Sequence, residues 1–289
     1  MRKLFGTGVA LVTTFDDKAE IDYKALKRLL VHTARGVDYF VVMGTTGESA
    51  TLSKEEKRQV LEFVLKNNPK KLPVVYGIGG NNTQGVVDEI KSTSLKGVSA
   101  ILSVSPYYNK PSQEGIYQHF KAVADVSPLP VILYNVPGRT GSNLTAQTTL
   151  RLATHPNIIG IKEASGNLEQ CMKIMKDKPK DFMLISGDDM LCLPVYAIGG
   201  VGIISVLANA LPQVFQKVKE NFYNGKMAQA QTAQFKIIDI NGPMYEEGNP
   251  VGVKYLLSLM GICNPCVRLP HAEPSKALRK KISELFQRL

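Results

Sequence analysis

Apolar runs alternate with amphipathic segments along the chain. The apolar runs have the length and composition of strands and begin near residues 8, 39, 73, 100, 130, 158, 182 and 202. Between them, apolar side chains recur at helical spacing, as at Leu26, Leu29 and Leu30. Eight such units, with no low-complexity linker, predict an α/β fold of the (β/α)8 TIM-barrel type rather than an open doubly wound sheet.

The remaining residues, 226–289, form a second region. Their pattern predicts helices over 227–245, 251–260 and 275–288, separated by Gly-Asn-Pro and Gly-Ile-Cys-Asn-Pro breaks. We therefore expect a barrel with the catalytic site at residues 1–225 and a small C-terminal helical region at 226–289. That region would serve packing or oligomerisation.

One uncharged stretch, residues 190–216, is long enough to span a bilayer. Pro194, the glycines of 199–202 and Pro212 divide it instead into a short helix, a strand over 202–206 and a helix from about residue 211. The N-terminal apolar run has no cleavage site for a signal peptidase, so it is interpreted as the first strand. These features predict a protein without a membrane partner.

The charge and the cysteine content limit which substrates, partners and cofactors are expected. The formal charge is +10, but the lysines are mixed with acids and lack interleaved aromatics, so small acidic substrates are favoured over nucleic acid. Four cysteines in a chain of this length do not make a disulfide framework, which fits a reducing cytoplasm, so a cytoplasmic protein is predicted. Cys263 and Cys266 form a single C-x-x-C, for which packing at a helix end is favoured over zinc binding or redox chemistry. The histidines lack metal-ligand spacing and no dinucleotide or P-loop motif occurs, so no metal and no cofactor are predicted.

A single lysine interrupts the apolar run at residues 158–166. In a strand, Lys162 shares a face with Gly160 and Ala164, which we expect to leave room for a ligand. Burial in an apolar pocket lowers the pKa of an amine from about 10.4 and allows attack on a carbonyl. Lys162 is therefore predicted to be a Schiff-base nucleophile, the alternative being a lysine that extends into solvent.

Further polar residues follow other strands, at the end of the barrel where active sites lie. Residues 44–49, Gly-Thr-Thr-Gly-Glu-Ser, offer backbone N–H groups and hydroxyls to a carboxylate. Tyr134 and Arg139 add a phenol and a guanidinium after the fifth strand, and Tyr107 and Tyr108 follow the fourth. Taken singly, these features also suit a tight turn, a core phenol or interface packing.

Together, the motifs at residues 44–48, 107–109, 134–141 and 161–166 closely resemble the 4-hydroxy-tetrahydrodipicolinate synthase (dihydrodipicolinate synthase) family, and the resemblance covers essentially the whole chain. It implies a lyase in lysine and diaminopimelate biosynthesis. In that family a lysine forms an imine with pyruvate, the enamine adds to L-aspartate 4-semialdehyde, and cyclisation gives 4-hydroxy-tetrahydrodipicolinate.

The resemblance also implies residue roles. The expected catalytic residues are the imine-forming Lys162 and a proton relay of Tyr134, Thr45 and Tyr108, the last from a neighbouring subunit. The expected substrate-binding residues are Thr46 for the pyruvate carboxylate, Arg139 for the semialdehyde carboxylate, Gly187 and Ile204. The protein is expected to be a homo-oligomer, with a tetramer formed as a dimer of dimers favoured over a dimer.

Two other functions remain open at this point. An N-acetylneuraminate lyase or related 2-keto acid aldolase shares the lysine, the tyrosine and the Gly-rich turn. Arg139 argues against it, because a sugar acid requires neutral hydroxyl-binding groups at that position. A non-catalytic barrel that binds keto acids would differ by showing no turnover.

Many members of this family are inhibited by lysine, and the corresponding effector positions here are Ser49, Ala50, Lys57, Asn81, Gly85 and Tyr107. Lysine-sensitive members carry a glutamate where Gly85 stands and a histidine where Lys57 stands. Both changes make the site more positive for a ligand with two ammonium groups, so weak or absent inhibition is expected. The alternative is compensation by the nearby acids Asp88 or Glu89.

Overall fold

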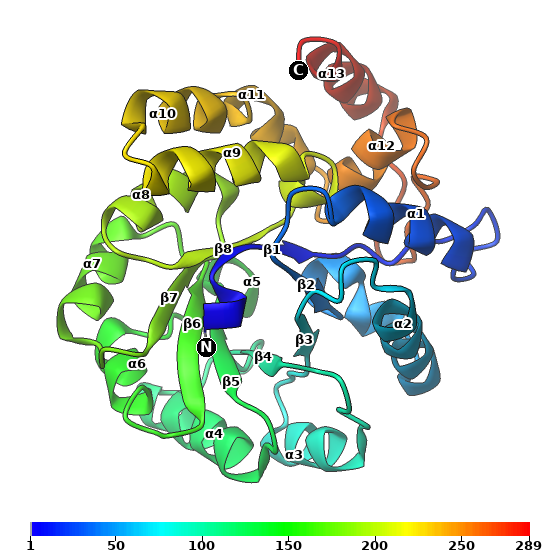
Figure 1. Cartoon of the computed structure of the whole chain (residues 1–289). Coiled ribbons are helices and arrows are strands. Elements are labelled where there is room, and N and C mark those ends of the chain that lie inside the picture. Colours follow the sequence, from blue (N-terminus) through cyan, green and yellow to red (C-terminus); the bar gives the residue numbers. More distant parts are fainter. Residues whose placement is uncertain (1) are drawn as a thin grey trace. The chain divides into compact units, whose positions relative to one another are not determined.

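The computed structural model describes residues 2–289. Within these residues eight strands form a closed barrel in the order β1 to β8, and at least one helix separates each strand from the next (Figure 1). The helices that follow the last strand form the C-terminal region. The predicted (β/α)8 barrel with a helical extension is therefore confirmed.

The strands are β1 Gly6–Ala10, β2 Tyr39–Val42, β3 Val74–Gly77, β4 Ala100–Val104, β5 Val131–Asn135, β6 Ile158–Glu163, β7 Met183–Ser186 and β8 Gly202–Ser205. The helices between them are α1 Tyr23–Thr33, α2 Lys54–Asn67, α3 Thr83–Ser92, α4 Gln113–Val126, α5 Pro137–Thr140, α6 Ala146–Leu152, α7 Leu168–Asp177 and α8 Cys192–Ala197. After β8 come α9 Pro212–Tyr223, α10 Met227–Phe235, α11 Ile238–Asn241, α12 Val251–Leu259 and α13 Lys276–Phe286.

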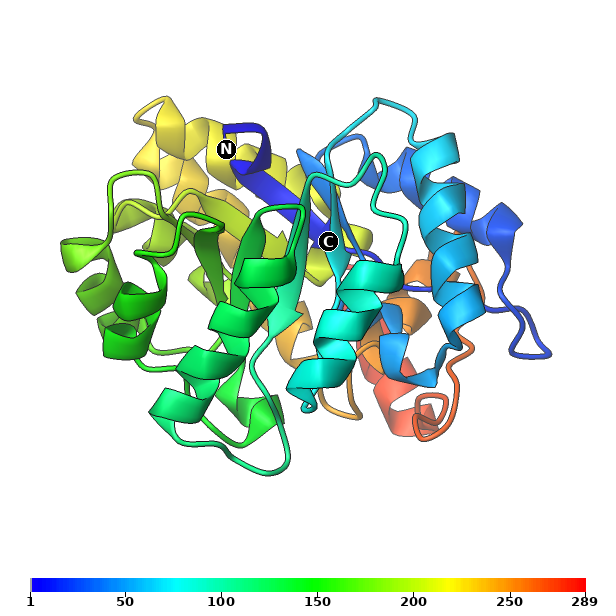
Figure 2. The same ribbon diagram turned by 90° about the horizontal axis from the view of Figure 1, so that it is seen from below.

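The chain folds as two compact units. The first contains residues 2–5 and Pro73–Ile204, in which strands β3 to β8 pair in parallel. Helices α4, α6 and α7 follow one another outside these strands (Figure 1), and α3 lies beside α4 (Figure 2). The strand side chains are almost all buried, as expected for a parallel sheet covered by helices.

The second unit contains Gly6–Leu72 and Ser205–Leu289. Strands β1 and β2 pair in parallel, with Gly8 opposite Tyr39. Helix α9 packs beside α10, and α12 packs against α13 (Figure 1). This unit therefore joins the first two strands to the C-terminal helices.

The helix expected over residues 227–245 is wrong, because it is interrupted. Helix α10 ends at Phe235, and the N–H groups of Lys236 and Ile237 bond to carbonyls three residues back instead of four. A further 3-10 turn, Gly242–Met244, contains Pro243, which has no N–H to continue a helix. The other two expected helices are found as α12 and α13, and no helix in residues 2–289 has the length and apolar character needed to cross a bilayer.

Candidate active site

Lys162 and Tyr134 form the centre of the candidate site in the first unit. They lie opposite each other, each one residue before the carboxyl end of its strand. Only 5% of Lys162 and 6% of Tyr134 is exposed, so the alternative of a lysine in solvent is wrong. The Lys162 Nζ lies 4.1 Å from the centroid of the Tyr134 ring, where the ring face attracts an ammonium group. An amine and a phenol are thus held together in a protected position.

Two glycines lie near Lys162, and they differ in the space that they leave. A Cβ on Gly160 would lie 2.7 Å from the carbonyl oxygen of Met183, its partner on β7. The expectation that Gly160 leaves room for a ligand is therefore wrong, because β7 fills that space. A Cβ on Gly187 would lie 3.0 Å from the Lys162 Cε and 2.6 Å from the Ala164 Cβ. Gly187 is the residue that gives the lysine side chain its room.

A buried carboxylate, Glu163, follows the lysine on β6 and points to the other face of the strand. Its oxygens accept hydrogen bonds from Asn135 Nδ2 at 2.9 Å, Gln170 Nε2 at 2.8 Å and the Ser165 N–H at 2.7 Å. The Asn135 Oδ1 accepts a bond from the Leu144 N–H at 2.9 Å. This network joins the ends of β5 and β6 to the segment after α5. Sequence reasoning missed it, although a second charge in an apolar run was a visible signal.

The predicted residues Arg139, Tyr107 and Tyr108 are exposed. Arg139 lies in α5 and forms no ion pair with any residue that the structure describes. Tyr107 is 40% exposed and Tyr108 is 86% exposed. Tyr108 has φ +74°, a left-handed conformation that is unfavourable for a bulky side chain. Such strain is typical of residues held for a function rather than for packing.

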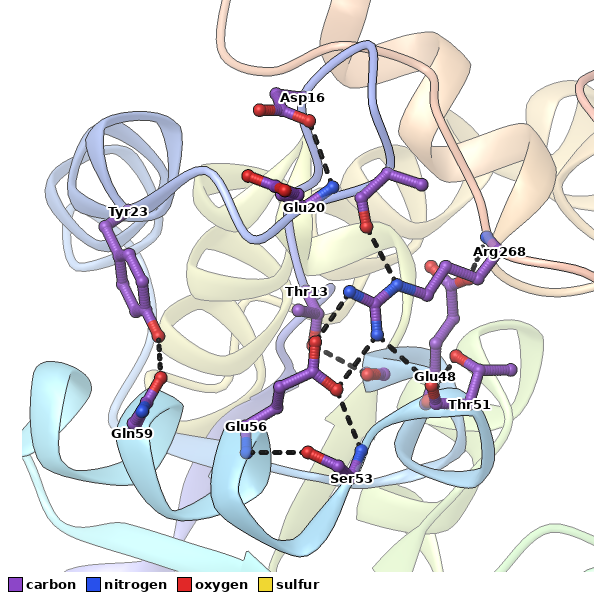
Figure 3. Close-up of polar contacts among 12 residues, drawn as sticks. Thr13, Asp16, Glu20, Tyr23, Glu48, Thr51, Ser53, Glu56, Gln59 and Arg268 are labelled. Carbon is purple, nitrogen blue, oxygen red and sulfur yellow. Dashed lines mark hydrogen bonds and ion pairs between the residues drawn. The ribbon is translucent and has the colours of Figure 1, made fainter.

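The predicted carboxylate-binding turn lies in the second unit. It folds as a 3-10 turn, Thr45–Gly47, and ends at Glu48 with φ +53°. Thr45 is exposed, whereas Thr46 is 2% exposed. The Thr46 Oγ1 accepts a hydrogen bond from Asn249 Nδ2 at 3.0 Å, which leaves its own O–H free to donate. The Thr13 hydroxyl donates to the Gly47 carbonyl at 2.6 Å (Figure 3), so the turn is held from two sides.

A second buried lysine was missed by sequence reasoning. Lys254 on α12 is completely buried, and its Nζ donates a hydrogen bond to Glu48 Oε1 at 2.5 Å. The available signal was the same as for Lys162, a lysine inside an apolar segment. The C-terminal region therefore contributes Lys254 and Asn249 to the turn that carries Thr46.

The other predicted positions are divided between the units. Ile204 is completely buried in β8, in the first unit. The first unit also holds three of the expected effector positions, Asn81, Gly85 and Tyr107, and the second unit holds Ser49, Ala50 and Lys57. Gly85 is exposed in the first turn of α3, and Asp88 on the same helix is exposed and accepts a bond from Gln84 Nε2 at 2.8 Å.

The C-x-x-C cysteines are free thiols. Burial raises the pKa of Cys263 to about 11 and also raises the pKa of Cys266. Thiols of this kind stay protonated near neutral pH and are weak nucleophiles and metal ligands. Within residues 2–289 no group of three or more His, Cys, Asp or Glu side chains is arranged to hold a metal ion.

The comparisons with known proteins point to one family over nearly the whole length of the chain. The model of the dihydrodipicolinate synthetase family matches residues 3–289. The 4-hydroxy-tetrahydrodipicolinate synthase of Cytophaga hutchinsonii is 51% identical over 285 residues, which is 98% of this chain and 96% of that protein. The crystal structure of a dihydrodipicolinate synthase from Bacillus anthracis has a TM-score of 0.95 at 37% identity, covering 99% of this chain and 98% of that one. A monomeric dihydrodipicolinate synthase variant has a TM-score of 0.95 at 33% identity, covering 99% of this chain and 96% of that chain.

Proposed function

The chain belongs to the dihydrodipicolinate synthetase family, and we propose that it condenses pyruvate with L-aspartate 4-semialdehyde to give 4-hydroxy-tetrahydrodipicolinate for lysine and diaminopimelate biosynthesis. The observation that carries this proposal is the Lys162 amine, 5% exposed and 4.1 Å from the Tyr134 ring centroid. A buried amine beside a phenol suits imine chemistry with a keto acid.

The first step is imine formation. The neutral Lys162 amine attacks C2 of pyruvate, the carbonyl oxygen gains two protons and leaves as water, and a C=N bond forms. Each proton movement needs a positioned acid or base. Tyr134 is suited to this role by its place beside the amine, and Thr45 and Tyr108 complete the proposed relay by their match to the family motifs. Burial of Lys162 also limits hydrolysis of the imine by water.

The second step joins the two substrates. Loss of a proton from C3 of the imine gives an enamine, whose C3 attacks the aldehyde carbon of the semialdehyde, and the resulting alkoxide gains a proton. The amino group of the semialdehyde portion then replaces the lysine nitrogen at C2, which closes the ring and frees Lys162. The lysine is regenerated, so no external oxidant, reductant or cofactor is required.

Two groups are proposed to hold the substrate carboxylates. The Thr46 hydroxyl, whose oxygen already accepts a bond from Asn249, is free to donate to pyruvate. Arg139 has no ion-pair partner in residues 2–289, and its guanidinium suits bidentate binding of the semialdehyde carboxylate. Gly187 and Ile204 are assigned to the pyruvate site.

Arg139 also separates this proposal from the sugar-acid aldolases, which need neutral groups for hydroxyls. A barrel that only binds keto acids would form an imine with pyruvate but would not consume the semialdehyde. Turnover of both substrates therefore distinguishes an enzyme from a binding protein.

The test of this function is reductive trapping. Pyruvate with borohydride should label Lys162 permanently and inactivate the protein, because reduction of the imine gives a stable secondary amine. Lys162→Ala should fold and take no label, whereas the control Lys219→Ala, which removes an ion pair with Asp38, should still be labelled. A label that maps to another residue would contradict the assignment.

For the assembly, we propose a homo-oligomer, and preferentially a tetramer built as a dimer of dimers. The proposal is supported by Tyr108, which is 86% exposed and strained, as expected of a residue donated to a neighbouring subunit. Mixing inactive Tyr108→Phe with inactive Lys162→Ala subunits should restore part of the activity. Verified subunit exchange without any recovery would indicate that each site is built within one chain.

Two general features of the chain suit this function. A formal charge of +10 attracts substrates that are both carboxylates. The cysteines Cys171, Cys192, Cys263 and Cys266 are free thiols, which suits the cytoplasm, where we place the enzyme.

A further inference from the structure

The ion pair between Lys254 and Glu48 is completely buried, with 0% of either side chain exposed. Besides its bond to Glu48, the Lys254 Nζ donates to the Cys266 carbonyl at 2.8 Å and lies 4.0 Å from the centroid of the Phe15 ring. Burial lowers the pKa of Lys254, and the Glu48 carboxylate opposes that effect. Buried ion pairs often contribute little net stability compared with apolar residues, because both charges lose their hydration. A geometric role is therefore a better explanation for this pair.

The other oxygen of Glu48 is held as well. The Arg268 backbone N–H donates to Glu48 Oε2 at 3.0 Å (Figure 3). The Arg268 side chain is itself fixed by bonds to Glu56 Oε1 at 2.6 Å and to the Ala19 carbonyl at 2.9 Å. The Glu48 carboxylate therefore has a defined position, set by two residues of the C-terminal region.

The fixed carboxylate of Glu48 matters because Glu48 ends the turn that is proposed to bind pyruvate. This turn carries Thr45 and Thr46, and the φ of Glu48, +53°, is uncommon for a residue with a side chain. Its fixed carboxylate favours that conformation over the alternatives open to a free turn. Asn249, from the segment before α12, bonds to the Thr46 hydroxyl in the same turn.

We propose that the C-terminal region positions the pyruvate-binding turn, with Lys254 and Arg268 fixing Glu48 and Asn249 orienting the Thr46 hydroxyl. This inference rests on the proposed function, in which Thr46 binds the pyruvate carboxylate. Lys254 also neutralises Glu48, whose charge would otherwise lie two residues from Thr46 in a poorly solvated place and repel a substrate carboxylate. These three are positioning residues, since none is assigned a contact with the reacting atoms.

The primary experiment uses Lys254→Met, which keeps an unbranched side chain only one atom shorter and removes its charge. The pyruvate concentration for half-maximal borohydride trapping, and the KM for pyruvate, should rise by roughly ten- to a hundredfold, because a displaced Thr46 hydroxyl loses its hydrogen bond to the charged carboxylate. The KM for the semialdehyde should stay within about twofold of the wild-type value. A purely structural role would lower stability without this selective change.

The matched control is Lys219→Met in the same unit. Lys219 pairs with Asp38 at 2.6 Å, and Asp38 lies before β2, whereas Glu48 lies after it. This variant should lower the thermal midpoint and leave the KM for pyruvate unchanged. A rise in KM equal to that of Lys254→Met would show that any lost ion pair has the same effect and would overturn the inference.

Two further variants keep the test decisive if Lys254→Met does not fold. Asn249→Ala removes one hydrogen bond to Thr46 and should also raise the pyruvate requirement. The double variant Glu48→Gln/Lys254→Met leaves no buried charge, so it should be stable but should still bind pyruvate weakly. Wild-type pyruvate affinity in both would refute the positioning role. Absence of trapping in the wild-type protein would instead refute the proposed function.

Discussion

Replacing Gly187 with alanine provides a sharp test of the site, because the structure defines what the new methyl group would meet. The added Cβ would lie 2.6 Å from the Ala164 Cβ and 3.0 Å from the Lys162 Cε. The first distance is too short for two carbon atoms, and the second is tight. Gly187→Ala should therefore move both the strand ends and the lysine.

These two contacts have different consequences. The Ala164 methyl is attached directly to the backbone, so relief requires a backbone shift, and overpacking of this kind costs roughly 1–3 kcal/mol. The lysine chain is flexible and can swing away, but a nucleophile displaced by about 1 Å loses up to about a hundredfold in rate. We therefore expect lower stability together with imine trapping that is roughly ten- to a hundredfold slower, the upper value being the loss for a displacement of about 1 Å.

The assay combines urea unfolding with the rate of borohydride trapping by pyruvate. Gly242→Ala is the control, since a Cβ there meets nothing within 4 Å and the backbone is already helical, with φ −54° and ψ −52°. It should leave the trapping rate unchanged and should not lower stability, because alanine at such a position stabilises by roughly 0.4–1 kcal/mol. Adding Ala164→Gly to Gly187→Ala removes the 2.6 Å contact but keeps the contact with Lys162. The double variant should recover stability while trapping stays slow. Trapping at the wild-type rate in Gly187→Ala would refute the view that this glycine sets the position of the amine.

Three other predictions follow. Arg139→Ala should lower kcat/KM for the semialdehyde by an amount equal to roughly 1.5–3 kcal/mol of lost transition-state binding, and it should leave pyruvate trapping unchanged. An unchanged kcat/KM for the semialdehyde with a selective defect in pyruvate, measured by steady-state kinetics, would reverse the assignment. Lysine in the millimolar range should inhibit weakly or not at all, because of Gly85 and Lys57; half-inhibition below about 0.1 mM, near −5.5 kcal/mol, would show that the site survives. Burial lowers the pKa of His119 to about 4 from 6.5, so the unfolded state takes up a proton first and stability should fall as the pH decreases through this range. Urea unfolding at pH 7 and 4.5 should show this loss, and His119→Phe should reduce it.

The fold was predictable because its strands are buried on both faces and appear as separate apolar runs. The largest difference in a strand start is at β1, which begins at Gly6 instead of residue 8. The tail was harder to predict. The C-cap residue of helix α10, Lys236, keeps right-handed helical angles, and no glycine, asparagine or proline stands there, so the sequence around Lys236 contains no clear stop signal.

The placement of a candidate residue was predictable where its own position in the sequence is unusual, as for Lys162, which is buried in its strand. It was not predictable where the role depends on a distant partner. Gly160 looked like space beside the amine, but its neighbour Met183 comes from the next strand. Glu48 and Lys254 are 206 residues apart in the chain. Register and long-range contacts of this kind leave no local pattern.

The comparison between Lys162 and Lys254 shows what decides the chemistry of a buried lysine. Both interrupt apolar segments, and both are almost or completely buried. Lys254 is bonded to a carboxylate and a carbonyl, which favour its ammonium form and occupy its protons. Lys162 has no ion pair within residues 2–289, and the adjacent Glu163 points to the opposite face, where amide and backbone N–H groups occupy its oxygens. The Lys254 amine is therefore held by fixed acceptors, whereas the Lys162 amine has no carboxylate that ties it down, which is why Lys162 is assigned to chemistry and Lys254 to position.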